Sequence, residues 1–355
     1  MLKILKTKTA NIQLPAFFPD ATKAVIRSVG TFDLKQCKTD GLVVNTYHLL
    51  NDGMIETIQH FGGIHKFMHF DKPVISDSGG FQVMSLIRNN PKNGKIEGTG
   101  IKFKMEGTGK TLYLTPQSCI ETQIKLGSDI IMCLDDCTNP EESHAEQIKS
   151  VERTITWAKE CKKAFTKLTK PLKQKPLLFA IIQGGNNKEL RKKCAKALIK
   201  IGFDGFAYGG WPVDGNKRFL SEILKYTAAL MPDNLPKYAM GVGKPENITE
   251  CVSMGYNMFD CVLPTRDARH KRLNIFTDVQ RNKYEYVYLG SGKHKNSTEP
   301  VSNYCDCVTC KNYSRGYLYH LFKIEDALSI HLATIHNLRF YAMYMENLRK
   351  VTAER

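Results

Sequence analysis

The segment LLFAIIQGG, at residues 177–185, shows the pattern that decides the fold: six apolar residues run directly into a glutamine and two glycines. The apolar part has the length and composition of a fully buried strand, and the glycines mark its end. Seven other segments are similar, and they give eight candidate strands in all: Pro15–Ala21, Gly41–Thr46, Pro73–Ser76, Asp129–Leu134, Gly205–Tyr208, Tyr238–Val242 and Met258–Leu263.

Between these strands lie longer segments with the apolar spacing of amphipathic helices, at Pro116–Leu126, Glu142–Phe165, Asn187–Ile201 and Lys217–Met231. Strands that alternate with helices predict an α/β fold with a parallel sheet. Eight such units predict a closed (β/α)8 barrel, the TIM barrel. A doubly wound open sheet is the competing architecture.

The unusual residues of the chain fall where the candidate strands end. In a barrel all these ends converge on one face, and that face holds the active site. A tight turn is enough to explain any single pair of glycines. Seven polar or glycine-rich clusters at strand ends together predict a functional site. The clusters are Asn45–His48, Asp77–Gly80, Asp135–Asp136, Gln183–Gly185, Gly209–Gly210, Gly241–Lys244 and Asp260–Arg266.

The charge balance points to a polyanionic partner. There are 51 Lys and Arg residues against 35 Asp and Glu residues, a net charge of +16. Such an excess favours nucleic acid, because each phosphate contact releases counterions, although many lysines merely solvate a surface. The basic residues are spread widely, with clusters at Lys162–Lys175 and Arg266–Arg272.

Cysteine usage and the N-terminus bear on location. The count of 11 cysteines is odd and most of them stand alone, which is typical of a reducing compartment. The first residues, MLKILKTKTANIQ, are too polar for a signal peptide. No stretch approaches the ~18 apolar residues of a membrane span. We therefore expect a cytoplasmic protein without a membrane partner.

Cys305, Cys307 and Cys310 form a C-x-C-x-x-C loop that can present three thiolates to one metal ion. A helix predicted at Asp326–Leu348 carries His331 and His336, and spacing alone does not choose between them. Three thiolates and one imidazole form a closed tetrahedral Zn²⁺ site, which is structural because no position is left for substrate. Buried free cysteines are the alternative. We expect one Zn²⁺ per subunit in a zinc-binding subdomain at about residues 278–345, attached to a single catalytic domain that covers residues 1–355.

Asp77 and Asp260 stand at strand ends among apolar and glycine neighbours. Two carboxylates across a pocket suit glycosidic chemistry, in which one attacks the anomeric carbon and the other handles a proton on the leaving group. Asp135 and Asp136 form a third acidic point. For each aspartate alone, a helix cap or a turn is an equally good interpretation.

Seven ordered motifs identify the chain as similar to the tRNA-guanine transglycosylase (queuine tRNA-ribosyltransferase) family. They are NTYHL at Asn45–Leu49, DSGGFQVMSL at Asp77–Leu86, LGSDI at Leu126–Ile130, GFDGFAYGG at Gly202–Gly210, YAMGVGKP at Tyr238–Pro245, MFDCVLPTR at Met258–Arg266, and the cysteine cluster. The resemblance implies a homodimeric (β/α)8-barrel transferase that exchanges guanine at the anticodon wobble position of tRNA for a 7-deazaguanine base.

The resemblance also implies residue roles. Asp260 would be the nucleophile that forms a covalent link to the ribose, and Asp77 the general acid and base. Arg266 and Arg269 would hold the anticodon loop, and His336 would be the fourth zinc ligand. The base would be bound by Asp135, Gln183, Ser78 and the backbone of Gly210, with its ring between Phe81 and Met240.

One segment departs from the family pattern. Residues 211–215 are Trp-Pro-Val-Asp-Gly. Bacterial members of the family usually have Leu-Ala-Val-Gly-Glu at this position. The resemblance implies that this segment contacts the substituent of the incoming base. Cys137 and Val213 match members that use the aminomethyl precursor of queuine, which we favour over queuine itself. The competing functions are a non-catalytic RNA-binding partner subunit of the same family, which would lack a catalytic aspartate, and a barrel hydrolase with a catalytic metal, for which the strand ends offer few ligands.

Overall fold

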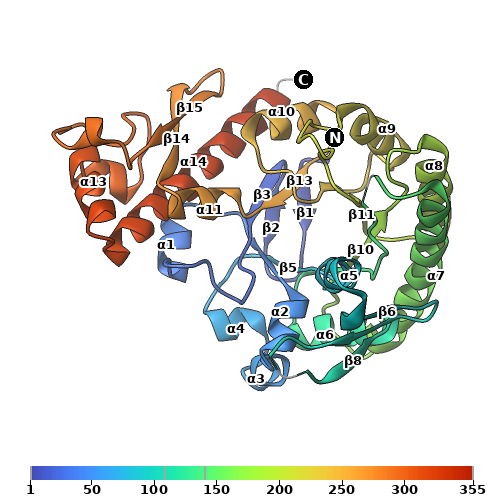
Figure 1. Cartoon of the computed structure of the whole chain (residues 1–355). Coiled ribbons are helices and arrows are strands. Elements are labelled where there is room, and N and C mark those ends of the chain that lie inside the picture. Colours follow the sequence, from blue (N-terminus) through green and yellow to red (C-terminus); the bar gives the residue numbers. More distant parts are fainter. Residues whose placement is uncertain (1, 108, 140, 354–355) are drawn as a thin grey trace.

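The computed structural model describes residues 2–107, 109–139 and 141–353. Its central element is a sheet of eight parallel strands (Figure 1), and each predicted strand is found at its predicted place. The strands are β3 (Ala16–Pro19), β4 (Leu42–Val44), β5 (Val74–Ser76), β9 (Ile130–Met132), β10 (Leu177–Ile182), β11 (Gly205–Tyr208), β12 (Lys237–Ala239) and β13 (Met258–Cys261).

The strand order closes the sheet into a barrel. The order is β3-β13-β12-β11-β10-β9-β5-β4, and all neighbours run parallel. At the seam between β3 and β4, a parallel bridge joins Asp20 to Val43, and the Ala21 N–H donates to the Val43 carbonyl at 2.7 Å. The predicted (β/α)8 barrel is confirmed, and the doubly wound sheet is excluded.

Inward-facing side chains fill the barrel. Phe18, Ile75, Met132, Phe179 and Met258 belong to one buried cluster, each at most 1% exposed. Because side chains alternate across a strand, the residues two places after Phe18, Ile75 and Met258 also face the barrel interior. These residues are Asp20 and Asp77, which directly follow β3 and β5, and Asp260 near the end of β13, so the three lie at the carboxyl end of the barrel.

Helices surround the barrel (Figure 1). The four predicted helices are confirmed, with shifted ends at three of them: α6 (Pro116–Leu126), α7 (His144–Thr169), α8 (Lys188–Ile201) and α9 (Ser221–Leu230). The others on and around the barrel are α1 (Thr31–Gln36), α2 (Thr46–Asn51), α3 (Ile55–His60), α4 (Ile64–Met68), α5 (Gly80–Asn89), α10 (Pro245–Ser253) and α11 (Leu263–Arg269).

Three small sheets were not predicted, and one of them, a hairpin after the barrel, is described below. The first two are the hairpin of β1 (Ile4–Lys6) and β2 (Asn11–Gln13), and the antiparallel sheet of β6 (Gly94–Ile96), β7 (Ile101–Lys104) and β8 (Thr111–Leu114). The three-stranded sheet lies between β5 and β9 in the sequence. The buried Trp157 of α7 donates its indole N–H to the Gly98 carbonyl at 2.8 Å, which ties this sheet to the barrel.

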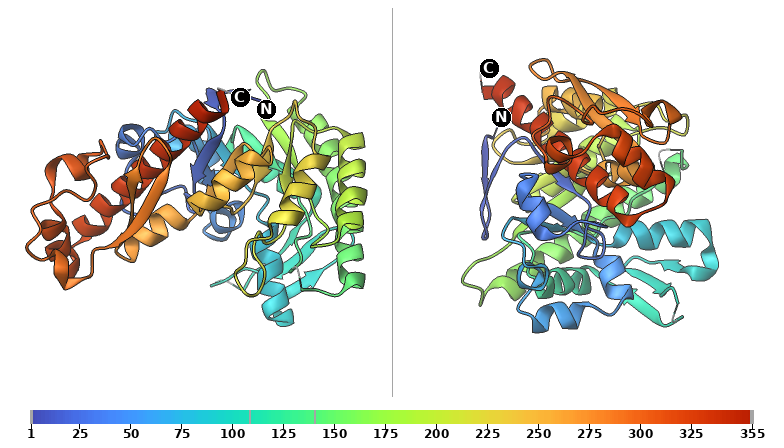
Figure 2. Two further views of the ribbon diagram at one scale, coloured as in Figure 1. Left: turned by 90° about the horizontal axis from the view of Figure 1, so that it is seen from above. Right: turned by 90° about the vertical axis from the view of Figure 1, so that its left-hand side faces the viewer.

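The elements after the barrel form a separate lobe beside it (Figure 2). They are the antiparallel hairpin of β14 (Arg272–Asp278) and β15 (Lys283–Tyr288), α12 (Val308–Asn312), α13 (Arg315–Lys323) and the long helix α14 (Ala327–Ala353). The bounds of about 278–345 for a subdomain stay a prediction, and β14 already begins at Arg272. Helix α14 returns to the barrel, where the Tyr341 ring lies 4.7 Å from the ring of Phe17 on β3.

Candidate active site and metal site

A cavity of about 450 Å³ opens among the carboxyl ends of the barrel strands. It brings together all eight residues that we predicted for catalysis and base binding: Asp77, Ser78, Phe81, Asp135, Gln183, Gly210, Met240 and Asp260. These residues come from six different strand ends, as expected for a barrel enzyme.

Asp260 sits near the end of β13 and is held at one carboxylate oxygen. The Tyr238 hydroxyl donates to Oδ1 at 2.7 Å, and the Gly241 N–H donates to the same atom at 2.9 Å. Burial raises the pKa of Asp260 to about 6, although both donors favour the charged form. Above that pH the carboxylate is ionised, and Asp260 lines the cavity.

Asp77 follows β5 and is held at both oxygens. The Thr46 N–H and the Gly79 N–H donate to Oδ1 at 2.9 and 3.1 Å, and the Asn45 side-chain amide donates to Oδ2 at 2.7 Å. Gly79 has φ +72°, and a Cβ there would lie 2.9 Å from the Tyr47 nitrogen, so this turn requires glycine. Burial raises the pKa of Asp77 to about 7, so this carboxyl is partly protonated at neutral pH.

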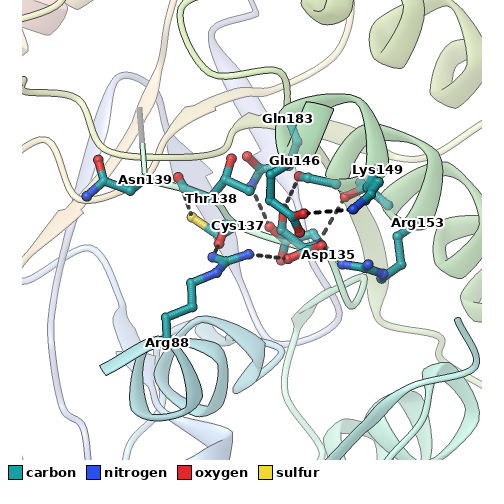
Figure 3. Close-up of polar contacts among 12 residues, drawn as sticks. Arg88, Asp135, Cys137, Thr138, Asn139, Glu146, Lys149, Arg153 and Gln183 are labelled. Atoms are coloured by element: carbon teal, nitrogen blue, oxygen red, sulfur yellow. Dashed lines mark hydrogen bonds and ion pairs between the residues drawn. The ribbon is translucent and has the colours of Figure 1, made fainter. Parts of the chain in front are cut away.

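Asp135 and Gln183 form the polar floor of the cavity. The Gln183 amide donates to Asp135 Oδ2 at 2.6 Å, and both residues are buried (Figure 3). Burial raises the pKa of Asp135 to about 7, more than the Gln183 donor lowers it. Gln183 Oε1 is buried without a partner in the described part of the chain, so it is free to accept a hydrogen bond from a ligand.

The loop after β9 is fixed from behind by two arginines (Figure 3). The buried Asp136 carboxylate accepts from Arg88 of α5 at 2.8 Å and from Arg153 of α7. Arg88 also donates to the Cys137 carbonyl. Asp136 is therefore occupied by these ion pairs, and Asp135 is the acid that faces the cavity.

A buried guanidinium joins the ends of β10 and β11. Arg191 of α8 is 0% exposed and donates to the carbonyls of Ile182, Gly185 and Gly209 at 2.5–2.9 Å. It also lies 4.2 Å from the Tyr208 ring centroid. These contacts fix the backbone on both sides of Gln183 and just before Gly210.

The segment that departs from the family pattern forms one wall of the cavity. Trp211 is 45% exposed, and its ring meets the edge of the Phe81 ring at a centroid distance of 5.8 Å. Asp214 points its carboxylate at its own turn, where Oδ1 accepts from the Asn216 and Arg218 N–H groups at 2.9 and 2.8 Å and Oδ2 accepts from Arg218 Nε at 2.8 Å.

Three residues of the site were not predicted from the sequence. Asp20 and Tyr238 line the cavity, and Arg27 lies near Arg269 in the loop after β3. The signal that found the other site residues is a polar residue directly after a candidate strand, and it did not mark Asp20, which lies inside the candidate strand Pro15–Ala21. Tyr238 lies inside its strand and gives no such signal.

Arg266 and Arg269 lie on α11, the short helix that follows β13 at the rim. Arg266 is exposed and Arg269 is half-buried. Partial burial lowers the pKa of Arg269, and repulsion from Arg27 and Arg266 lowers it further. Arg27 and Arg266 thus act on Arg269 as neighbouring positive charges, and Asp20 attracts Arg269.

The predicted zinc ligands converge. The ligand atoms of Cys305, Cys307, Cys310 and His336 all lie within 4.8 Å of one another, and His336 Nδ1 lies 3.1 Å from the Cys310 sulfur. The His336 Nε2–H donates to the Asn274 carbonyl at 2.7 Å, which leaves Nδ1 free to bind a metal. Three sulfurs and one imidazole nitrogen fit a tetrahedral Zn²⁺ ion.

His331 lies elsewhere. Its Nδ1–H donates to the carbonyl of Ser28, in the loop after β3, at 2.6 Å. Spacing alone left open whether His331 or His336 is the fourth ligand. Of these two histidines, only His336 lies in the cluster.

The chain matches the model of the family described as queuine tRNA-ribosyltransferase over residues 2–354. It belongs to this family. It is 39% identical to the queuine tRNA-ribosyltransferase of Lysinibacillus sphaericus over 349 residues. This match covers 98% of this chain and 87% of the relative. The queuine tRNA-ribosyltransferase of Idiomarina loihiensis is 41% identical, and the match covers 95% of this chain and 86% of the relative. That of Staphylococcus aureus is 38% identical, and the match covers 99% of this chain and 89% of the relative.

Family membership makes the chain an enzyme, a tRNA-ribosyltransferase. The match spans both the barrel and the lobe with the metal cluster. Among the described helices, none has the length and apolar character needed to cross a membrane.

Proposed function

We propose that this enzyme exchanges guanine at the wobble position of tRNA for a 7-deazaguanine base, through a covalent Asp260–ribosyl intermediate. The observation that carries the proposal is the convergence of Asp77 and Asp260 on one cavity, each with its own set of donors. Two carboxyl groups with separate environments can take separate roles in one reaction.

Asp260 is the proposed nucleophile. Its Oδ1 is anchored by Tyr238 and Gly241, so the other oxygen can attack C1′ of the nucleotide. A bond forms between this oxygen and C1′ as the bond from C1′ to the guanine nitrogen breaks. The incoming base then attacks C1′ and displaces Asp260. Two inversions give net retention of configuration.

Asp77 is the proposed acid and base. Its pKa of about 7 allows it to donate a proton to the departing guanine and to accept one from the incoming base. Asp260, with a pKa of about 6, is the more readily ionised of the two, in accordance with its role as nucleophile.

Asp135 and Gln183 are the proposed base readers. The carboxylate of Asp135 can accept hydrogen bonds from the N–H groups of a guanine-like ring, and the free Oε1 of Gln183 adds another acceptor. Ser78 and the backbone of Gly210 assist, and Phe81 and Met240 cover the two faces of the ring. Their positions around one cavity support these roles.

For the incoming base, Cys137 and Val213 favour the aminomethyl precursor over queuine. Asp214 does not add to that preference, because its carboxylate is bound by Arg218 and the backbone of its own turn. Comparing turnover with the aminomethyl base and with queuine decides between them. Inactivity with both bases would contradict the substrate assignment.

The remaining assignments complete the proposal. Arg266 and Arg269 hold the anticodon loop through its phosphates. Cys305, Cys307, Cys310 and His336 bind one structural Zn²⁺ in a zinc-binding subdomain. The enzyme acts in the cytoplasm, where tRNA and reduced cysteines coexist.

We also propose a homodimer. Tyr313 and Tyr317 stack at a ring distance of 5.6 Å, and Tyr317 stacks on His320 at 6.5 Å. The Tyr317 side chain is 41% exposed. Exposed aromatic groups of this kind are enriched at protein interfaces.

Label exchange tests the function. The enzyme, a wobble-guanine tRNA and labelled guanine should give labelled RNA, and Asp260→Asn should abolish the exchange while leaving the fold intact. Unchanged exchange in that variant would refute the nucleophile. A non-catalytic partner subunit is the alternative, and wild-type enzyme that binds the tRNA without exchanging label would favour it.

A further inference from the structure

Asp20 is a third carboxylate in the active-site cavity, and the proposed reaction does not use it. It ends β3, which lies next to β13 in the barrel, and Asp260 pairs with Phe18 in that register. Phe18 faces the barrel interior, so Asp20, two residues further, faces inward as well. Around the barrel, β3 stands between β13 and β4, and β5 follows β4. Asp20 therefore lies on the arc of wall between Asp260 and Asp77.

Among the described residues, Thr22 supplies the hydrogen bonds to the Asp20 carboxylate. Its hydroxyl donates to Oδ1 at 2.8 Å, its backbone N–H is a second donor, and no other described side chain donates to Asp20. Burial raises the pKa of Asp20, and the Thr22 donors, His48 and Arg269 lower it. An acceptor that faces a cavity in this way is available for a donor on a ligand.

The chemistry of RNA limits what that donor can be. Within an RNA chain the 3′ and 5′ oxygens of each ribose carry phosphates, so the 2′-hydroxyl is the one free sugar donor. The phosphates repel a carboxylate, and Arg269, whose charge Asp20 attracts, can bind a phosphate instead. The atom that Asp260 attacks, C1′, is bonded to the carbon that carries the 2′-hydroxyl.

We propose that Asp20 accepts a hydrogen bond from the 2′-hydroxyl of the nucleotide whose base is exchanged, and so makes this site specific for ribose over deoxyribose. The 2′-hydroxyl is the group by which proteins distinguish RNA from DNA. In glycosidic reactions, hydrogen bonds to the neighbouring hydroxyl strengthen as positive charge develops on the sugar. Asp20 thus contributes to rate as well as to recognition. This inference rests on the proposed function.

The test uses two anticodon-arm RNA hairpins that differ only at the reacting nucleotide, which is guanosine in one and 2′-deoxyguanosine in the other. Exchange of labelled guanine is measured for wild type, Asp20→Val, Asp20→Asn and a matched control, Asp71→Asn. Asp71 is exposed and precedes β5, at the opposite end of the barrel from the cavity.

We expect Asp20→Val to lower kcat/KM on the ribose substrate by about 10- to 100-fold, the range for loss of one hydrogen bond to a charged group. On the deoxyribose substrate the same variant should change kcat/KM by less than about threefold, because the partner is already missing. Asp20→Asn keeps an acceptor oxygen and should lie between wild type and Asp20→Val. Asp71→Asn should match wild type on both.

Binding of free guanine, measured by calorimetry, separates a structural effect from the proposed one. It should be unchanged in both Asp20 variants, because the base alone carries no ribose. Equal losses on the two hairpins, or weaker guanine binding, would overturn the role of Asp20. Absence of exchange by wild type on the ribose hairpin would instead contradict the proposed function.

Discussion

The cavity at the strand ends and the cysteine cluster in the lobe are both sets of polar side chains gathered from distant parts of the chain, yet they are built differently. At the cluster, the ligand atoms face one another within 4.8 Å. In the cavity, Gln183 Oε1 has no protein partner among the described residues, and the carboxylates face open space.

This difference in geometry indicates the role of each site. Four ligands that fill a tetrahedral shell leave no position for a substrate, so the metal stabilises structure. Polar groups that are fixed on one side and open on the other are arranged for a ligand that arrives later. Damage to the cluster should therefore cost folding, and damage to the cavity should cost activity alone.

Removing one zinc ligand should have the largest effect on the fold. Cys307→Ala leaves an incomplete shell, and structural zinc sites contribute about 10–16 kcal/mol of apparent binding free energy in small domains. We expect loss of bound zinc and a lower melting temperature, measured by metal analysis and thermal unfolding. Cys251→Ala, at a buried thiol outside the cluster, is the control. A zinc-free variant that melted like wild type would break the comparison.

Removing the proposed acid and base should lower activity strongly without an effect on the fold, although less than Asp260→Asn does. Asp77→Asn should lower the exchange rate by about 10²- to 10⁴-fold, the usual contribution of such a group. The thermal unfolding curve should keep its wild-type midpoint to within a few degrees. A large loss of stability would show that Asp77 is structural, contrary to the proposal.

The pH profile sharpens the same assignment. Asp260 must be ionised to attack, so kcat/KM for tRNA should rise through its pKa of about 6. Asp77 must hold a proton to release guanine, so the rate should fall as pH rises through its pKa of about 7. The two groups titrate as a pair, which gives a bell-shaped curve. In Asp77→Asn the falling limb should disappear, and its persistence would assign that limb to another group.

Removing a base reader should have a smaller effect. Gln183→Ala deletes the donor to Asp135 and the free acceptor, so KM for the incoming base should rise about 10- to 100-fold. KM for tRNA should change little. Steady-state kinetics with each substrate varied in turn measures both, with Gln59→Ala on the exposed face of α3 as control.

The smallest expected effect is at Trp211. Trp211→Ala removes the edge contact with Phe81, a type of contact worth about 0.5–1.5 kcal/mol. We expect a rise of about 2- to 10-fold in KM for the base and no change in kcat. An unchanged KM would place the wall of Trp211 outside the base site.

The barrel could be predicted because its signals are local. Each strand is a short apolar run followed by a polar cluster, as at Leu177–Gly185, and the helices between have clear periodicity. The sheet of β6, β7 and β8 was missed because polar residues, among them Lys95, Lys102 and Lys104, interrupt its strands, so they lack the continuous apolar runs by which the barrel strands were recognised.

The same difference between local and distant signals explains which site residues were predicted. Asp77, Asp135 and Asp260 follow apolar strands in distinctive motifs and were predicted. Asp20 directly follows β3, which Pro15 precedes and Pro19 ends, so the sequence there resembles a turn. Its place beside Asp260 depends on the register between β3 and β13, which are separated by almost the whole chain. Only the closed barrel brings them together.

Helix α14 links the lobe to the barrel at several points. It supplies His336 to the metal cluster, places His331 against the loop that carries Arg27, and packs Tyr341 on Phe17 of β3. It follows every other element in the chain. During synthesis on the ribosome, the outer side of the neighbouring strands β13 and β3 thus stays uncovered until α14 emerges. The nascent barrel exposes an apolar flank at Phe17 for that interval, so the barrel is complete only when the last helix is made.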